Sequence, residues 1–251
     1  MSTENKEKIT VGDVVKYEED IKPFPLVKIY AGVGSGKSYF AGKMITGSQE
    51  YGIPEHHALI ITSRRAKVEE TLKELGADVK PSITKNGNLS FEAWETGEDR
   101  PEKYEKYLRT VKYDNDFGEH EITFYNQSAV CTNAFVSAYL RYVYDEEEPI
   151  TDIWNKFDVV IIDEVHSLIT DSTYQSATFD VLEFVKDFLY RYQNNQIQNR
   201  ENKHLILMTG TPQPFEDLVN LEFPEECINK RILFDECENV VPKNVILIDE
   251  L

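Results

Sequence analysis

The sequence predicts an α/β fold in which a mostly parallel central sheet is covered by helices on both faces. Short apolar segments typical of buried strands alternate with amphipathic helical segments along most of the chain, as in successive βαβ units. The first strand runs into a glycine-rich turn at residues 31–38, and a later strand ends in two adjacent acids, Asp163 and Glu164. Because ligands of open α/β sheets bind beyond the carboxyl ends of the strands, these two features predict where the functional site lies.

Composition is compatible with one large domain or two small ones, and it argues against a membrane-spanning or secreted protein. The 251 residues include 41% hydrophobic residues, enough to fill a core, and carry a formal net charge of −18. No apolar run is long enough to span a bilayer, and the polar N-terminus lacks the apolar centre of a secretory signal. Cys131, Cys227 and Cys237 show no paired spacing, so we expect reduced thiols in a cytoplasmic protein. The acidic balance argues against non-specific nucleic-acid binding by the whole surface, so a polyanion would need a local basic patch.

The first half of the chain predicts two strand–helix pairs. Leu26–Ala31 (LVKIYA) and Ala58–Thr62 (ALIIT) are apolar runs rich in β-branched residues, which is typical of buried strands. A helix is expected to begin at about Gly36, directly after the glycine-rich turn, and a second one over residues 66–75 (AKVEETLKEL).

The domain organisation that we predict is a polar N-terminal segment at 1–22 followed by one domain at 23–251. Within that domain, residues 77–120 are too long and too hydrophilic for a plain connection, so we interpret them as an insertion with a small hairpin or helix. Residues 121–126 (EITFYN) then predict a strand, and residues 134–144 (AFVSAYLRYVY) predict a helix.

The second half continues the alternation of strands and helices. Residues 158–163 (DVVIID) form the clearest buried strand in the chain, and residues 204–210 (HLILMTG) and 244–249 (NVILID) predict two more. Between the first two, residues 179–192 place apolar side chains at helical spacing, which indicates a helix that faces the core.

The segment AGVGSGKS, Ala31–Ser38, has the pattern of a phosphate-binding loop with alanine in place of the first glycine. Its glycines let successive backbone N–H groups point at phosphates, and the helix that follows adds positive potential. Lys37 is expected to reach the β- and γ-phosphates of ATP, and the Ser38 hydroxyl to bind Mg²⁺. A glycine turn with a surface lysine is the alternative. The residues expected to bind this cofactor are Gly32, Val33, Gly34, Ser35, Gly36, Lys37 and Ser38.

The two acids at the end of the strand at 158–163 indicate which reaction the bound nucleotide would undergo. Asp163 is expected to hold the Mg²⁺ together with Ser38, and Glu164 to orient and deprotonate a water that attacks the γ-phosphate. The alternative is that the two carboxylates only cap the next helix.

Four motifs give the chain a resemblance to a known family. Asp163-Glu164-Val165-His166 resembles the DExH box of superfamily 2 helicases, which implies a catalytic role for His166. TGTP (209–212) resembles their third motif, in which the hydroxyls of Thr209 and Thr211 would couple nucleotide state to strand movement. TSRR (62–65) and CTN (131–133) are similar to their nucleic-acid-contacting motifs. The nucleic-acid residues implied by these last two motifs are Ser63, Arg64, Arg65 and Thr132.

The resemblance extends from about residue 23 to the end and implies a RecA-like P-loop NTPase lobe, a three-layer sandwich. Its implied activity is ATP hydrolysis coupled to movement on, or remodelling of, DNA or RNA. Helicases of this class use two such lobes, and the second supplies a Gly-Arg motif that stabilises charge on the transferred phosphoryl group. The chain contains no Gly-Arg dipeptide. We therefore expect the second lobe to be missing here and to act in cis or in trans, and we expect slow hydrolysis without it.

Two other functions remain open at this point. A nucleotide-dependent switch or scaffold would bind ATP without turnover; the acidic surface and the missing arginine favour it, whereas Glu164 does not. A DNA-packaging motor ATPase shares the phosphate loop and the acid pair, but His166 and the TGTP segment make it a poorer match.

The TSRRAK segment generates a first prediction, since it gathers Arg64, Arg65 and Lys67 at one strand end of an acidic chain. Phosphates of a nucleic-acid backbone are bound by such groups. Replacing Arg64 and Arg65 by glutamine should weaken DNA or RNA binding and leave ATP binding intact, as measured by parallel titrations. Unchanged nucleic-acid affinity would reject this role.

Overall fold

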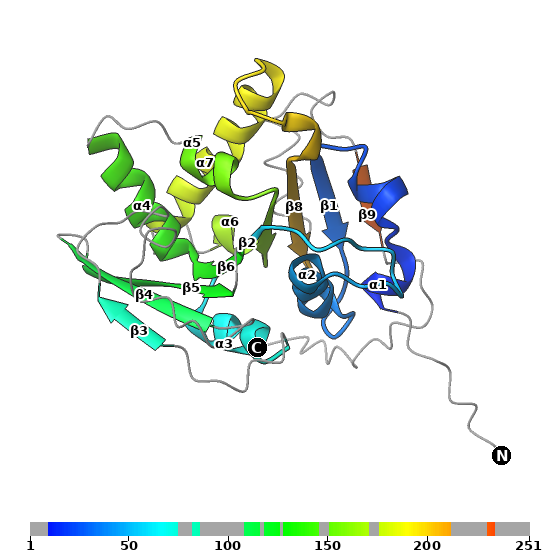
Figure 1. The fold of residues 1–251 in the computed structure, drawn as a ribbon, viewed down its shortest axis with the longest axis horizontal. Helices are drawn as coiled ribbons and strands as arrows, with labels where there is room; N and C mark the ends of the chain where they lie inside the picture. Colours follow the sequence, from blue (N-terminus) through cyan, green and yellow to red (C-terminus); the bar gives the residue numbers. More distant parts are fainter. Residues whose placement is uncertain are drawn as a thin grey trace, which may run out of the picture.

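The structure is a computed structural model that describes residues 10–74, 82–85, 108–115, 118–125, 128–145, 151–170, 176–211 and 230–233. Nine strands within these ranges form one sheet in the order β3-β4-β5-β6-β2-β7-β8-β1-β9 (Figure 1). The strands are β1 Leu26–Tyr30, β2 Ala58–Thr62, β3 Ser82–Lys85, β4 Leu108–Asn115, β5 Gly118–Tyr125, β6 Ser128–Thr132, β7 Val159–Asp163, β8 His204–Thr209 and β9 Lys230–Leu233.

The sheet is mostly parallel, as the sequence predicts. All neighbouring pairs from β6 to β9 are parallel, whereas β4 pairs antiparallel with β5 and β5 antiparallel with β6. Strands β1, β2, β7 and β8 are buried along their whole length. Continuous burial explains why these strands are largely apolar, with Lys28 in β1 and His204 in β8 as buried exceptions, because a central parallel strand has helices over both faces.

The two faces of the sheet carry separate groups of helices. In β7, Val160 and Ile162 pack toward α4 Asn133–Asp145, α5 Thr151–Lys156, α6 Ser167–Thr170 and α7 Ser176–Gln193. Val159 and Ile161 point to the opposite face, which is covered by α1 Val11–Val14, the π-helix η1 Tyr17–Ile21, α2 Lys37–Thr46 and α3 Arg65–Glu74. The three-layer arrangement of the prediction is therefore confirmed.

No helix of the described part of the chain combines the length and the apolar character needed to cross a membrane.

The N-terminal segment is more closely integrated than the sequence suggests. The sequence predicts that the domain begins at residue 23. In the structure, however, the buried core that contains α2 also includes Val11, Val15, Tyr17 and Ile21. Short helices with only one or two apolar residues per turn give a weak periodic signal, and this explains why the sequence did not indicate them.

Strands also extend the sheet where a polar insertion was predicted. Within 77–120, β3 and β4 lie at the sheet edge, and β4 forms a hairpin with β5 (Figure 1). At the other edge, the sequence did not indicate the four-residue β9. The strand predicted at 244–249 lies outside the described residues.

A cluster of aromatic and histidine rings lies where the parallel strands begin. The Tyr17 ring is 5.0 Å from the His56 ring and 6.5 Å from the His204 ring. His204 Nδ1 lies 3.0 Å from the Phe24 carbonyl oxygen, whereas the buried Nε2 of His56 has no hydrogen-bond partner among the described residues. Burial lowers the pKa of His204 and lowers the pKa of His56 from 6.5 to about 4, with the His204 ring acting in the same direction. The fold therefore holds His56 neutral.

This cluster predicts how stability depends on pH. Between pH 6.5 and about 4, His56 is protonated in the unfolded chain and neutral in the folded chain, so the free energy of unfolding should fall as the pH decreases. We expect a contribution of up to about 1 kcal/mol per pH unit, because one proton accounts for at most about 1.4 and the ring is partly screened by solvent. Urea unfolding at pH 7.5, 6.0 and 5.0 should show a shallower pH slope for H56Q. The exposed neighbour His57 provides the control, and an H56Q slope equal to those of H57Q and the unsubstituted protein would contradict the prediction.

Candidate functional site

The predicted site residues lie at one edge of the sheet. Strands β1, β2, β6, β7 and β8 are mutually parallel, so their carboxyl ends meet at this edge. The segments that follow these strands are the glycine-rich loop 31–38 after β1, Ser63 and Arg64 after β2, Asn133 after β6, Glu164 after β7 and Gly210 after β8.

The glycine-rich loop depends on backbone conformations that favour glycine. Gly34 and Gly36 have φ angles of 77° and 83°, in the left-handed region, and Gly36 caps the amino end of α2. A Cβ atom on Gly36 would also lie 3.2 Å from Thr10 Cβ. The Val11 N–H donates a 2.9 Å hydrogen bond to the Ser35 carbonyl oxygen, so the N-terminal segment supports the loop from outside.

Lys37 is buried beneath this loop. Its Nζ donates to the carbonyl oxygens of Ala31, at 2.7 Å, and Gly32, at 3.1 Å. Burial lowers the pKa of Lys37, and the carboxylates of Glu164 and Asp163 act in the opposite direction. An ammonium group whose partners are neutral carbonyls can still gain strongly from an anion placed in the loop.

The other residues of the loop differ in exposure. Val33 is 76% exposed at the tip and Ser38 is half-buried, whereas Ser35 is buried and its Oγ has no hydrogen-bond partner in the described structure. The loop therefore presents mainly its backbone, Lys37 and Ser38 to a ligand.

The acid pair at the end of β7 is held in a constrained geometry. Asp163 is 4% exposed, and its Oδ1 accepts a 3.0 Å hydrogen bond from the Glu164 N–H. Burial raises the pKa of Asp163, with the Glu164 charge adding to the shift and Lys37 opposing it. Glu164 has a φ of 55°, a left-handed conformation that costs on the order of 1 kcal/mol outside glycine and that often marks functional positions.

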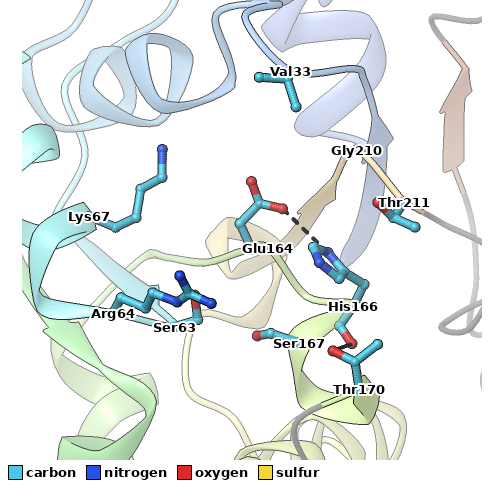
Figure 2. Close-up of a pocket in the computed structure, with 10 residues that line it drawn as sticks. All are labelled: Val33, Ser63, Arg64, Lys67, Glu164, His166, Ser167, Thr170, Gly210 and Thr211. Atoms are coloured by element: carbon cyan, nitrogen blue, oxygen red, sulfur yellow. Dashed lines mark hydrogen bonds and ion pairs between the residues drawn. The ribbon is translucent and has the colours of Figure 1, made fainter. Parts of the chain in front are cut away.

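His166 connects the acid pair to the end of β8. Its Nδ1 lies 2.8 Å from Thr209 Oγ1 and 3.3 Å from Glu164 Oε2, and Figure 2 shows the ring directed toward the glutamate. The Thr211 N–H donates to Thr209 Oγ1 at 3.0 Å. One ring nitrogen thus joins the carboxylate to the threonine segment.

Backbone contacts bring the same segment against the glycine-rich loop. The Ala31 N–H donates to the Thr209 carbonyl oxygen at 2.9 Å. A Cβ atom on Gly210 would lie 3.3 Å from the Ala31 carbonyl oxygen and 3.7 Å from Lys37 Nζ, so a larger residue would press on the loop. The ends of β1 and β8 therefore cannot shift independently.

Two neighbouring cavities open at this edge. The first, of about 340 Å³, we call the loop cavity; its lining includes Gly34, Lys37, Ser38, Glu164, Lys67 and Glu70. The second, of about 460 Å³, we call the edge cavity; its lining includes Ser63, Arg64, Glu164, His166, Gly210 and Thr211 (Figure 2). Glu164, Lys67 and Val33 line both cavities.

The residues predicted to contact nucleic acid are not all at the same place. Ser63 and Arg64 line the edge cavity. Arg65 is the first residue of α3, but its side chain lies outside the described part of the structure. Thr132 accepts a 3.4 Å hydrogen bond from the Phe135 N–H and, within the described chain, lines neither cavity. Its oxygen is engaged at the start of α4.

The sequence does not predict that Lys67 and Glu70 belong to the nucleotide site. The TSRRAK segment places Lys67 in a basic patch, but nothing in this segment predicts that its side chain lines the cavity beside the glycine-rich loop. The spacing of the two residues on one helix was a usable signal, because side chains three apart are neighbours.

The sequence also matches a known family over most of its length. Residues 13–214 match the family described as type III restriction enzyme, res subunit. The chain belongs to this family. The res-subunit family carries the N-terminal ATPase lobe of superfamily 2 helicases, which confirms the resemblance and the RecA-like fold. A search of curated proteins finds no match.

The residues present fit the ATP and Mg²⁺ that helicase-type domains such as the res subunit generally use. Mg²⁺ binds hard oxygen ligands, and often only one or two protein groups hold it beside substrate phosphates. The Ser38 hydroxyl and the Asp163 carboxylate are ligands of this kind; Ser38 lines the loop cavity, whereas Asp163 is buried and lines neither cavity. No cluster of three or more His, Cys, Asp or Glu suited to a metal occurs among the described residues.

The buried carboxylate predicts a trade-off between stability and ligand binding. Because the folded-state pKa of Asp163 is raised, its ionised form destabilises the free protein at pH values above its ordinary pKa of 3.8. D163N should raise the thermal unfolding midpoint at pH 7, and a rise of about 2–4 °C corresponds to about 1 kcal/mol. The gain should shrink toward pH 4, and Mg²⁺-ATP should stabilise the unsubstituted protein more than D163N. A midpoint lowered by D163N in the free protein would contradict this account.

Proposed function

We propose that the chain hydrolyses ATP as a helicase or translocase lobe and couples hydrolysis to movement on, or remodelling of, DNA or RNA. The observation that carries the proposal is that Lys37, Ser38 and Glu164 line one cavity although they come from two distant parts of the sequence. A phosphate loop and a water-activating carboxylate must share one cavity for phosphoryl transfer to water.

Each residue then has a distinct part in the reaction. Lys37 holds the β- and γ-phosphates, exchanging its carbonyl partners for phosphate oxygens, while the loop N–H groups bind the same phosphates. When bound, Mg²⁺ neutralises charge on the phosphates, and Ser38 and Asp163 are the residues that would hold it. Glu164 orients a water and accepts its proton.

The contact between His166 and Thr209 supports a role in coupling. His166 Nδ1 faces both the Glu164 carboxylate and the Thr209 hydroxyl. A change at Glu164 on hydrolysis would therefore reach Thr209, which is buried, and through it Gly210 and Thr211, which line the edge cavity. We infer that this contact links the loop cavity to the edge cavity.

The edge cavity is the proposed place of the nucleic acid. Arg64 and Ser63 offer a cation and a hydroxyl to backbone phosphates. Arg65 and Thr132 remain predictions from the resemblance alone. We expect a second RecA-like lobe, in cis or in trans, to complete the nucleotide site with an arginine.

The test is ATP turnover with and without single- and double-stranded DNA and RNA, measured for the unsubstituted protein and for E164Q. Nucleic acid should stimulate a slow basal rate, and E164Q should lower turnover about 10²- to 10⁴-fold while retaining ATP binding, since it removes only the base. E183Q, which removes an exposed glutamate of α7, provides the control. ATP binding without turnover under every condition would favour a nucleotide switch instead.

A further inference from the structure

Lys67 has a position that the proposed roles do not use. It lies in the first turn of α3, its side chain is 34% exposed, and it lines both the loop cavity and the edge cavity. Its Nζ forms a 2.8 Å ion pair with Glu70 Oε2. Figure 2 shows Lys67 across the edge cavity from His166 and Thr211. The ammonium is therefore held at the mouth of the site by a partner on its own helix.

The charges around Lys67 connect it to the reactive end of the site. The Glu70 hydrogen bond is the largest cause of a raised Lys67 pKa, and the Asp163 and Glu164 carboxylates act in the same direction. In turn, the Lys67 charge lowers the pKa of Lys37. Lys37 and Lys67, from different elements, thus line the loop cavity together with Glu164, near which the terminal phosphate would lie.

The position of Glu70 shows which of the two cavities contains both members of the ion pair. Glu70 is part of the lining of the loop cavity, and the lining of the edge cavity includes Lys67 but not Glu70. The edge cavity has its own cation, Arg64. A nucleotide in the loop cavity would consequently meet both members of the pair, one attractive and one repulsive.

We propose that Lys67 distinguishes nucleoside triphosphates from diphosphates by leaving Glu70 for the terminal phosphate. The proposal rests on the proposed function, because it requires a nucleotide in the loop cavity. Ion pairs between residues three apart on a partly exposed helix are weak, whereas a γ-phosphate offers more negative charge and several acceptor oxygens. A diphosphate does not extend toward Glu164, so Lys67 keeps its contact with Glu70. The pair acts as a latch that opens only for the triphosphate.

The test compares the affinities for a non-hydrolysable ATP analogue and for ADP, both with Mg²⁺, by calorimetric titration. K67Q should lower the triphosphate-to-diphosphate affinity ratio about tenfold, a typical effect of losing one charge-assisted hydrogen bond, and leave ADP affinity within about twofold. E70Q leaves Lys67 without its competing carboxylate and should raise the same ratio by roughly 1.5- to twofold. Opposite changes of the affinity ratio in K67Q and E70Q distinguish a phosphate contact from a structural role. Loss of a purely structural ion pair would change the ratio in the same direction in both variants.

The chain provides a matched control pair. Lys186 and Glu183 on α7 form an ion pair of 2.9 Å with the same spacing of three residues. K186Q and E183Q should leave both affinities unchanged, and thermal unfolding of all four variants checks that they are folded. Should K67Q fail to fold, E70Q alone still decides the proposal, since its ratio must rise.

The possible failures are distinguishable. If the unsubstituted protein binds neither nucleotide, the proposed function itself is wrong. If it binds both and K67Q keeps the affinity ratio, the latch is wrong and the proposed function stands. Equal weakening of both nucleotides by K67Q, or a loss of nucleic-acid affinity with an unchanged ratio, would also overturn the latch.

Discussion

The site depends on opposite charges buried together at the carboxyl edge of the sheet. Lys37 and Asp163 are both nearly inaccessible, and burial shifts the pKa of each toward its neutral form. Charges removed from water in this way are stabilised only by each other and by fixed dipoles. In this chain the Ala31 and Gly32 carbonyls serve Lys37, and the Glu164 N–H serves Asp163. The free protein is thus left with electrostatic strain that a metal–phosphate ligand would relieve.

The central strands of the sheet determine how far the glycine-rich loop lies from the acid pair. Strand β8 lies between β1 and β7, so it sets the separation of the loop and the acid pair. The last two residues of β8 accept hydrogen bonds from segments just beyond both neighbouring strands: the Thr209 carbonyl accepts from Ala31, after β1, and the Met208 carbonyl accepts from Val165, after β7. Side chains on both faces of these strands are buried, and close-packed interiors resist small displacements. These contacts therefore tie the ends of β1, β7 and β8 to one another.

Sequence reasoning predicted those parts of the structure that local physics dictates. The loop glycines follow from the φ angles of Gly34 and Gly36, and the position of Asp163 follows from the buried run before it. Burial of residues 11–21, addition of β9 and turning of Lys67 toward the loop cavity depend on contacts between distant segments. Hydrophobic periodicity carries little information about such contacts in short elements. The roles assigned to the site residues rest on chemistry and on the family, and they remain predictions.

The acidic composition is compatible with an anionic ligand at this edge. The net charge of −18 belongs to the whole chain, and at physiological ionic strength the field of an exposed carboxylate is screened within about 8 Å. Lys37 lines the loop cavity, Arg64 lines the edge cavity and Lys67 lines both, so a polyanion in either cavity would meet cations at short range. The nearby acids, Asp163 and Glu164, are the groups that a metal and a reacting water would require. Acidity elsewhere lowers non-specific attraction to nucleic acid, so it would confine the proposed polyanion binding to the strand ends.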